Sequence, residues 1–343
     1  MTPNDRRTLL PINGIAAPVR IENAQRIAKT VIKWLLTILA VGFVARFIIT
    51  NLAAFPALYT EWRARGDQGW TVLALVTCYV LSWLVVAAQF YFPLRRLNAN
   101  VGFTENAALI IGGALLNYSP FKAGVLYRFY YFKRWHDISY TTLAGLQLLR
   151  VLLTVGASGL FGLVAFAFAI AGNGNANWAL LSIFGLMTFG GSVAVAIAPR
   201  LARRLTGPIS RFATELVRGI NELRRSLKLT LILFGLIGCQ FGVLIVQYKI
   251  IFFVLGLEPP VVAYLVLVPL ITMLGMVSIT PGNLGLREIA IAMALSLSDV
   301  SFRSGMFVGL MDRGAITVAT IAFGSLSLIY LVSIRRSRTT KAP

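Results

Sequence analysis

The chain places charged and helix-breaking residues inside apolar sequence at two points. The first reads NYSPFKAGVLYR, from Asn117 to Arg128, and the second reads SITPGNLGLRE, from Ser278 to Glu288. Each contains a hydroxyl residue, then Pro, three further residues and Gly, and each supplies an Arg within four residues of that Gly. Guanidinium groups and the amino ends of helices bind phosphate well. The two segments therefore predict anion binding.

Each segment is followed by a second Arg inside apolar sequence. Arg150 occurs in GLQLLRVLL and Arg313 in GLMDRGAIT, 30 residues beyond Pro120 and 32 beyond Pro281. An Arg or Asp at the centre of a membrane helix costs about 2.5–3.5 kcal/mol on insertion scales. We therefore expect these charges to line a polar cavity, in which arginines outnumber acids. The alternative is a structural role, in which Arg150 and the Asp312–Arg313 pair fix the register of the helices.

The candidate substrate-binding residues come from both segments and from the two helices that follow them. They combine hydroxyl and amide groups, charged side chains, and the Pro and Gly residues that free backbone groups. Backbone groups freed inside a membrane are tolerated only around a protein-lined cavity. The set is Asn117, Ser119, Pro120, Gly124, Arg128, Arg150, Thr280, Pro281, Gly282, Asn283, Gly285, Arg287, Glu288, Asp312 and Arg313.

The composition is that of an integral membrane protein. Hydrophobic residues make up 57% of the 343 residues, in long blocks rather than at the spacing of a soluble amphipathic helix. A membrane-spanning helix needs about 20 mostly apolar residues. We predict one transmembrane domain over 29–335, between a cytoplasmic tail at 1–28 and a basic cytoplasmic tail at 336–343. Seven full spans are expected at about 31–50, 70–92, 141–171, 177–199, 229–255, 261–279 and 305–334.

The net charge of +20 is concentrated in particular loops rather than spread over the chain. Five Lys or Arg residues occur before residue 30, eight at 200–228 and four after residue 334, whereas 171–177 and 256–260 have none. Loops rich in Lys and Arg stay on the cytoplasmic side of a membrane. We therefore expect a multi-pass protein of the cytoplasmic (inner) membrane with both termini inside, and no nucleic-acid partner.

Residues 200–228 form the most basic of these loops. Apolar residues recur between its arginines from Ile209 to Leu227, in ISRFATELVRGINELRRSL. Such a helix lies flat on a membrane, where each Lys or Arg near anionic lipid contributes about 1 kcal/mol. We expect a basic interfacial helix that binds anionic lipids of the inner leaflet. The alternative is a solvated connector that only orients the protein.

The topology requires two segments to enter and leave the membrane on one side. The stretch at about 105–131 has basic cytoplasmic residues at both ends, so it enters from inside. The stretch 281–297 must return outward after 261–279, so that the basic carboxyl end is cytoplasmic. Two halves of similar content and opposite direction are typical of inverted-repeat transporters. The predicted fold is an all-α polytopic membrane protein with two re-entrant or broken-helix hairpins, and with repeats at about 29–171 and 177–335.

The second segment resembles the transmembrane region of lysylphosphatidylglycerol synthases, which also occurs as stand-alone flippase-like proteins. The resemblance covers about residues 30–335 and implies a membrane protein that handles lipids. No acyltransferase domain follows, so aminoacylation of lipid is not implied. Relatives often have Gly-Glu-x-x-Arg in the first segment, where this chain has GVLYR with Val125 in place of the acid. The family landmarks fall on Pro120, Gly124 and Arg128, and on Pro281, Gly282, Gly285, Arg287 and Glu288.

Residues for covalent or metal catalysis are scarce. The chain has two Cys and one His, His136, and no pair of carboxylates in a metal-binding DxD pattern. We therefore expect no cofactor, no metal and no enzymatic activity. The leading hypothesis is translocation of an anionic or phosphate-bearing lipid across the membrane, with a lipid-linked sugar as one candidate. The alternatives are a membrane-embedded lipid or sugar transferase, with Glu288 or Asp312 as general base, and a scaffold for lipid-modifying enzymes.

Overall fold

All regular structure in the described part of the chain is helical, and no strand occurs there. The computed structural model describes residues 31, 34–35, 37–53, 56, 60, 63–64, 68–97, 99–119, 123–171, 182, 184–186, 188–190, 226–276, 280–298 and 300–340. The predicted all-α class is confirmed, and four helices long and apolar enough to cross a membrane indicate a multi-pass membrane protein. They are α3 (Gln68–Arg96), α6 (Tyr140–Ala171), α9 (Leu227–Val254) and α12 (Phe302–Thr340).

Helices α4 (Phe103–Leu116) and α5 (Ala123–His136) form the first expected hairpin, called hairpin 1 below. Each has 14 residues. At 1.5 Å per residue this is about 21 Å, too short to cross a hydrocarbon core of about 30 Å. The two helices approach closely at Gly124, where a Cβ would lie 2.0 Å from the carbonyl oxygen of Gly113. The absence of a side chain at Gly124 therefore permits this packing.

Helices α10 (Val261–Met276) and α11 (Leu286–Ser296) form the second hairpin, called hairpin 2. They have 16 and 11 residues, and the short 3-10 helix η2 (Pro281–Asn283) lies between them. The sequence predicts a full span at 261–279, whereas α10 is shorter and is one limb of the hairpin. An apolar run ahead of a Pro-Gly break has the same hydropathy whether it spans the membrane or turns back inside it. Hydropathy alone therefore does not distinguish a full span from a hairpin limb.

The turn of hairpin 2 explains the glycines of its Pro-Gly-x-x-Gly sequence. Gly282 has a φ of 57° and Gly285 a φ of 78°, in the left-handed region that Gly adopts without steric cost. Asn283, at a φ of 53°, belongs to the residue types that tolerate this region best after Gly. A Cβ at Gly285 would also lie 2.5 Å from the backbone carbon of Ala40. The helix at Thr37–Thr50 therefore packs directly on this turn.

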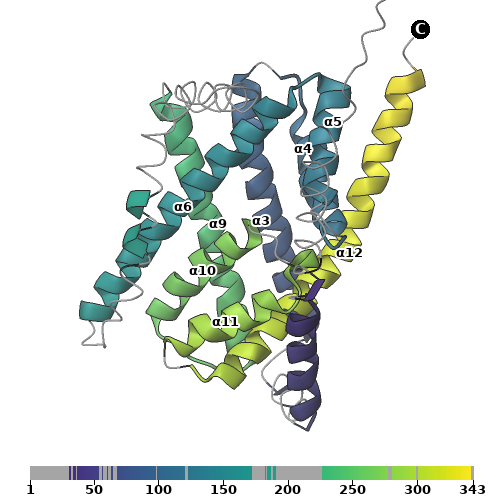
Figure 1. The fold of residues 1–343 in the computed structure, drawn as a ribbon. Coiled ribbons are helices and arrows are strands. Elements are labelled where there is room, and N and C mark those ends of the chain that lie inside the picture. Colours follow the sequence, from purple (N-terminus) through teal and green to yellow (C-terminus); the bar gives the residue numbers. More distant parts are fainter. Residues whose placement is uncertain are drawn as a thin grey trace, which may run out of the picture.

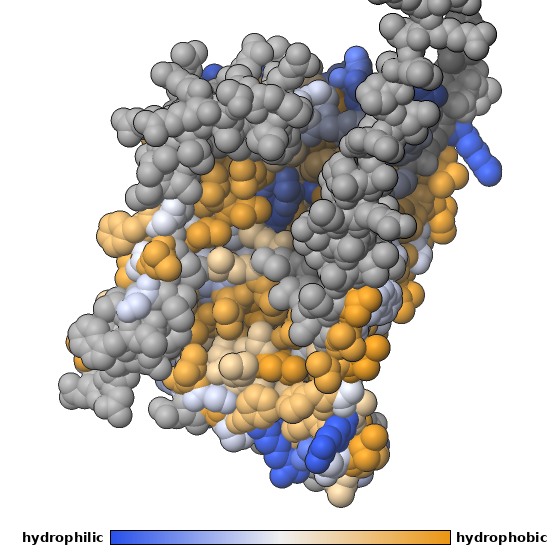
Figure 2. Space-filling view, in the orientation of Figure 1, coloured by the Kyte–Doolittle hydropathy of each residue, from blue (hydrophilic) through white to orange (hydrophobic). Residues whose placement is uncertain are grey.

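The two hairpins lie toward opposite ends of the molecule. In Figure 1, α4 and α5 occupy the upper half of the view, and α10 and α11 the lower half. The long helix α12 packs against both α4 and α11, while α3 packs against α9. Many large apolar side chains are exposed on the outside, and Figure 2 shows the hydrophobic surface that they give one face. Helix α12 is therefore a common support for both hairpins.

Two clusters of buried apolar side chains anchor the hairpins. One includes Phe241, Tyr248 and Leu267, and joins α10 and α11 of hairpin 2 to α3, α9 and α12. The other includes Leu109 and Phe132, and joins α4 and α5 of hairpin 1 to α6, α9 and α12. Each hairpin therefore has its own apolar core, and both cores share α9 and α12.

Several predicted features lie outside the described residues. These are the tail at 1–28, Pro120, most of the span at 177–199, and the basic helix at 200–228 apart from its last three residues. Helix α12 continues to Thr340, so it includes the first residues of the basic tail predicted at 336–343. The sequence SIRRSRTT contains neither Gly nor Pro, so it lacks the residues that commonly end a helix.

Replacing Gly124 by Ala should destabilise hairpin 1, because the added Cβ would clash with the carbonyl oxygen of Gly113. Overpacking of this kind costs about 1–3 kcal/mol. We expect a lower melting temperature for the purified protein in detergent. The matched control is Gly235→Ala in α9, where a Cβ meets no atom within 4 Å. Equal melting temperatures for the two variants would contradict the close packing of α4 on α5.

Candidate functional site

A cavity of about 290 Å³ lies between the two hairpins and the long helices. Four arginines line it: Arg128 from α5, Arg150 from α6, Arg287 from α11 and Arg313 from α12. No carboxylate is among the described residues of its wall. Apolar side chains complete the wall, together with polar residues that include Asn117, Tyr118, Gln147, Gln240, Thr272 and Asn283.

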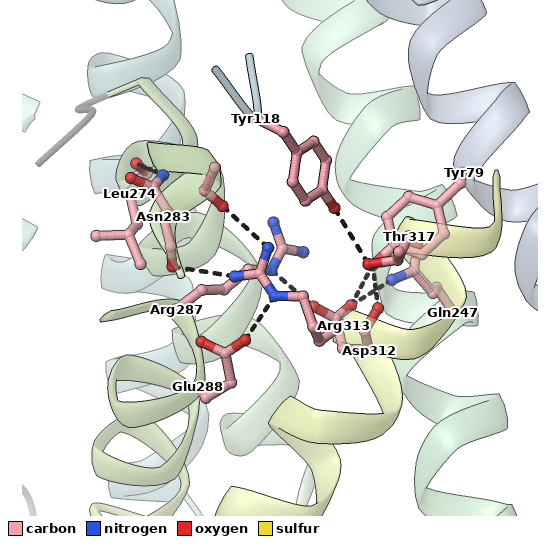
Figure 3. Close-up of polar contacts among 11 residues, drawn as sticks. Tyr79, Tyr118, Gln247, Leu274, Asn283, Arg287, Glu288, Asp312, Arg313 and Thr317 are labelled. Atoms are coloured by element: carbon pink, nitrogen blue, oxygen red, sulfur yellow. Dashed lines mark hydrogen bonds and ion pairs between the residues drawn. The ribbon is translucent and has the colours of Figure 1, made fainter. Parts of the chain in front are cut away.

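The turns of the two hairpins meet at this cavity. The backbone N–H of Gly282 donates to the carbonyl oxygen of Asn117 at 3.1 Å. The ring of Tyr118 lies against Gly282, and its hydroxyl is 3.2 Å from that of Thr317 in α12 (Figure 3). Two segments that are far apart in the sequence are therefore in direct contact.

Arg287 is paired with a buried acid. Its Nε donates to Oδ2 of Asp312 at 2.6 Å, and the Asp312 side chain is fully buried. The other carboxylate oxygen accepts hydrogen bonds from the amide of Gln247, at 2.8 Å, and from the hydroxyl of Tyr79 (Figure 3). Both oxygens of Asp312 are therefore satisfied behind the cavity wall.

Arg313 connects α12 to hairpin 2. Its Nε donates to Oε1 of Glu288 at 2.5 Å. Its two terminal nitrogens donate to the backbone carbonyl oxygens of Gly282, at 2.9 Å, and of Asn283, at 3.0 Å (Figure 3). The amide of Asn283 in turn donates to the carbonyl oxygen of Leu274 at 2.8 Å. Since all three nitrogens of the guanidinium group are engaged, Arg313 fixes the turn of hairpin 2.

The two ion pairs are reciprocal in sequence. Arg287 and Glu288 are neighbours in α11, Asp312 and Arg313 are neighbours in α12, and both pairs join residues 25 positions apart. Each helix thus presents one positive and one negative charge to the other. Removing one partner of a buried ion pair costs about 3–5 kcal/mol, because the other charge is left without compensation. The pairs therefore fix the position of α11 on α12.

Arg128 and Arg150 have amide partners instead of acids. A terminal nitrogen of Arg128 donates to Oε1 of Gln147 at 3.0 Å, and Nε of Arg150 donates to Oε1 of Gln89 at 2.7 Å. The guanidinium carbons lie 4.1 Å and 5.5 Å from the centroid of one ring, that of Phe90. Neither Arg forms an ion pair with a described residue. With two acids for four arginines, the described residues give the site an excess of two positive charges.

The remaining predicted site residues are set back from the cavity or lie outside the described part of the chain. Ser119 and Thr280 donate their hydroxyls to carbonyl oxygens of their own turns, at 2.5 Å and 3.0 Å. Gly285 packs on the helix at Thr37–Thr50, Pro281 begins η2, and Pro120 is not described. The predicted residues that line the cavity are Asn117, Gly124, Arg128, Arg150, Gly282, Asn283, Arg287 and Arg313.

Three glutamine residues of the site were not predicted from the sequence. Gln89, Gln240 and Gln247 lie in helices that read as apolar spans. Gln89 links two of the site's polar side chains, since it accepts from Arg150 and donates to Oε1 of Gln240 at 3.0 Å. Their positions inside predicted spans could have identified them, because an amide inside a membrane helix is rare and faces the protein interior or a polar cavity.

A third buried acid lies away from the cavity. Glu105, in the first turn of α4, is 5% exposed and accepts a hydrogen bond from the hydroxyl of Tyr131 at 2.6 Å. Nε2 of His136 lies 3.2 Å from the same carboxylate oxygen. This contact ties the two outer ends of hairpin 1 together, and it gives the single His of the chain a structural role.

The fold and the cavity define an integral membrane protein with a charged site among its helices. The family model described as Lysylphosphatidylglycerol synthase TM region matches residues 30–324. The chain therefore belongs to this family, which confirms the resemblance of the two Pro-containing segments and implies a lipid-related function. Neither a curated protein nor a solved structure matches the chain.

Replacing both partners of the Arg287–Asp312 pair should cost much less stability than the sum of the single replacements. Arg287→Met or Asp312→Leu alone leaves a buried charge unpaired and should cost about 3–5 kcal/mol, whereas the double variant leaves none. Thermal unfolding in detergent measures the coupling. Asp137→Ala serves as the control, because Asp137 pairs with Lys133 on the exposed surface and its loss should change little. Simple additivity at positions 287 and 312 would contradict the pairing.

Proposed function

We propose that this protein moves an anionic or phosphate-bearing lipid, with a lipid-linked sugar among the candidates, between the leaflets of the cytoplasmic membrane. The observation that supports this most is the cavity lined by four arginines, which two acids balance among the described residues. Guanidinium groups bind phosphate through paired hydrogen bonds. A cavity of about 290 Å³ suits a headgroup rather than whole acyl chains. The tails would stay in the bilayer while the headgroup passes through the protein.

The proposed mechanism uses an inverted repeat. Hairpins 1 and 2 enter from opposite sides of the membrane and are related by a pseudo-two-fold axis in the membrane plane. Their short helices, their places toward opposite ends of the molecule and the contact between their turns support this arrangement. In this topology six of the seven predicted spans surround the hairpins, because the span at 261–279 contains α10 of hairpin 2, and both termini are cytoplasmic. Rocking of one repeat against the other would then expose the cavity to each side in turn.

The basic loop has a separate part in the proposal. Residues 200–228 contain eight Lys or Arg residues. We propose that they lie on the inner leaflet, where each basic side chain near anionic lipid contributes about 1 kcal/mol of attraction. This would raise the local concentration of anionic lipid beside the cytoplasmic hairpin.

Transport without covalent change fits the site better than catalysis does. The two acids considered as general bases, Glu288 and Asp312, each form an ion pair with an arginine, and neither lines the cavity. A scaffold for lipid-modifying enzymes has no need of charges among its transmembrane helices. We therefore propose that the protein is not an enzyme.

Reconstitution into liposomes tests the proposal. Fluorescent phosphatidylglycerol and phosphatidylcholine would be placed in one leaflet, and their accessibility to a membrane-impermeant quencher followed with and without protein. Faster movement of the anionic lipid, with the lipid recovered chemically unchanged, is expected. A modified lipid product would favour a transferase. No acceleration over protein-free liposomes for any anionic or phosphate-bearing lipid would refute transport and favour the scaffold.

Replacing Arg287 by Ala should abolish lipid movement, and Arg287→Lys should recover little, because an ammonium group cannot reproduce the bidentate guanidinium fork. The Arg287→Met/Asp312→Leu double variant separates function from folding, since it leaves no unpaired buried charge and should be stable yet inactive. Arg46→Ala is the control, because Arg46 is exposed on the N-terminal helix. Lipid movement at the unmodified rate in the double variant would show that the headgroup does not need Arg287.

A further inference from the structure

We infer that the hairpin 1 side of the cavity binds a phosphate group with two negative charges, a phosphate monoester or a diphosphate, between Arg128 and Arg150. The biological setting of this site, a lipid headgroup in transit, rests on the proposed function. The site itself rests on the contacts of the two arginines and on the residue at position 125. The proposed site makes the hairpin 1 side of the cavity chemically different from the hairpin 2 side, although the two hairpins resemble each other in sequence.

The arginines on the hairpin 2 side are already compensated. Arg287 is paired with Asp312 at 2.6 Å and Arg313 with Glu288 at 2.5 Å. Arg313 also uses both of its terminal nitrogens on backbone carbonyl oxygens. A built-in carboxylate already balances each of these charges, so an anion there gains hydrogen bonds from Arg287 but meets no uncompensated charge. This side therefore provides shape and hydrogen bonds but no excess charge.

The arginines on the hairpin 1 side are not compensated by any described acid. Arg128 is only 6% exposed, so its charge has little contact with solvent. Gln147 and Gln89 accept one hydrogen bond from each guanidinium group, and a guanidinium group has five N–H donors. The ring of Phe90 attracts both cations, whose guanidinium carbons lie 4.1 Å and 5.5 Å from its centroid, and both arginines line the same cavity. An anion between them would use the remaining donors and relieve the repulsion.

The two positive charges of Arg128 and Arg150 determine which type of phosphate group the site prefers. Two guanidinium groups are neutralised by one dianion, whereas a phosphodiester such as that of a common phospholipid carries one charge and leaves an excess of one. A phosphate monoester carries about −1.5 to −2 at pH 7 and offers three acceptor oxygens. The site therefore favours a lipid with a terminal phosphate or a diphosphate over a phosphodiester, and disfavours a cationic headgroup.

Val125 is the residue that leaves this charge in place. It lines the cavity on α5, three residues before Arg128. Residues three apart lie on the same face of a helix, so an acid at this position would pair with Arg128 and cancel one of the two charges. The apolar side chain of Val125 therefore determines whether the hairpin 1 side takes a dianion or a monoanion.

Calorimetric titration of the purified full chain in detergent tests the site. The probes are dihexanoyl phosphatidic acid, a phosphomonoester, and dihexanoyl phosphatidylglycerol, a phosphodiester, each below its micelle concentration. We expect at least tenfold tighter binding of the phosphomonoester. Val125→Glu should reduce that preference to less than threefold, while Val125→Gln, of the same size without the charge, should keep it. Equal affinity of the unmodified protein for both probes, or an unchanged preference in Val125→Glu, would overturn the inference.

Further measurements keep the outcome interpretable. If Val125→Glu fails to fold, as judged by its melting temperature, Arg150→Gln replaces it and should lose the preference. Arg46→Gln removes a charge far from the cavity and should keep it. Inorganic phosphate distinguishes the source of the ligand: affinity equal to that of phosphatidic acid indicates a free phosphate site, and weaker binding indicates a lipid headgroup, with the dianion site supported in both cases.

The inference and the proposed function fail in different ways. A tenfold preference for the phosphomonoester without movement of any lipid in liposomes would refute transport and leave the site standing. Movement of anionic lipid by a protein that binds both probes equally would refute the site and leave transport standing.

Discussion

A charge among membrane helices needs a partner, and this constraint accounts for the arrangement of the polar residues. Desolvating a charged side chain is expensive, so the buried charged side chains of the described helices lie beside polar partners. Asp312 and Glu288 are paired with Arg287 and Arg313, and Glu105 bonds a tyrosine and a histidine. In α11 an Arg precedes a Glu, and in α12 an Asp precedes an Arg. Because each Arg pairs with the acid of the other helix, this order specifies the register in which α11 packs on α12.

The broken helices follow from the same constraint. A turn inside the membrane frees backbone N–H and C=O groups that must be satisfied locally. In hairpin 2 the freed carbonyls of Gly282 and Asn283 accept from Arg313, and the freed N–H of Gly282 donates to Asn117 of hairpin 1. The arginine on α12 is therefore part of the backbone structure of the turn, and it is also part of the cavity wall. Arg313 therefore contributes both to the stability of the fold and to the candidate site.

The sequence predicted the all-α class, the family, the two hairpins and the convergence of four arginines, because these depend on hydropathy, on Pro and Gly, and on the cost of buried charge. It did not predict which charges pair. Arg150 was grouped with Arg313 by spacing from a proline, yet one has a glutamine as partner and the other a glutamate. Partner choice depends on the rotation of each helix, and residues such as Gln89 carry no motif that fixes it. Composition also does not distinguish a span from a hairpin limb at 261–279, since it does not record where a chain turns.

The contact between the hairpin turns has a consequence for how the molecule could move. Among the described residues, the direct backbone link between them is one hydrogen bond, from Gly282 to Asn117, with the ring of Tyr118 packed beside it. A single hydrogen bond contributes about 0.5–1.5 kcal/mol, far less than a buried ion pair or an apolar core. The described contact between the turns is therefore much weaker than the packing of each hairpin on α12. The turns could separate while each hairpin stays packed on α12, so a passage between them would need no helix to unfold.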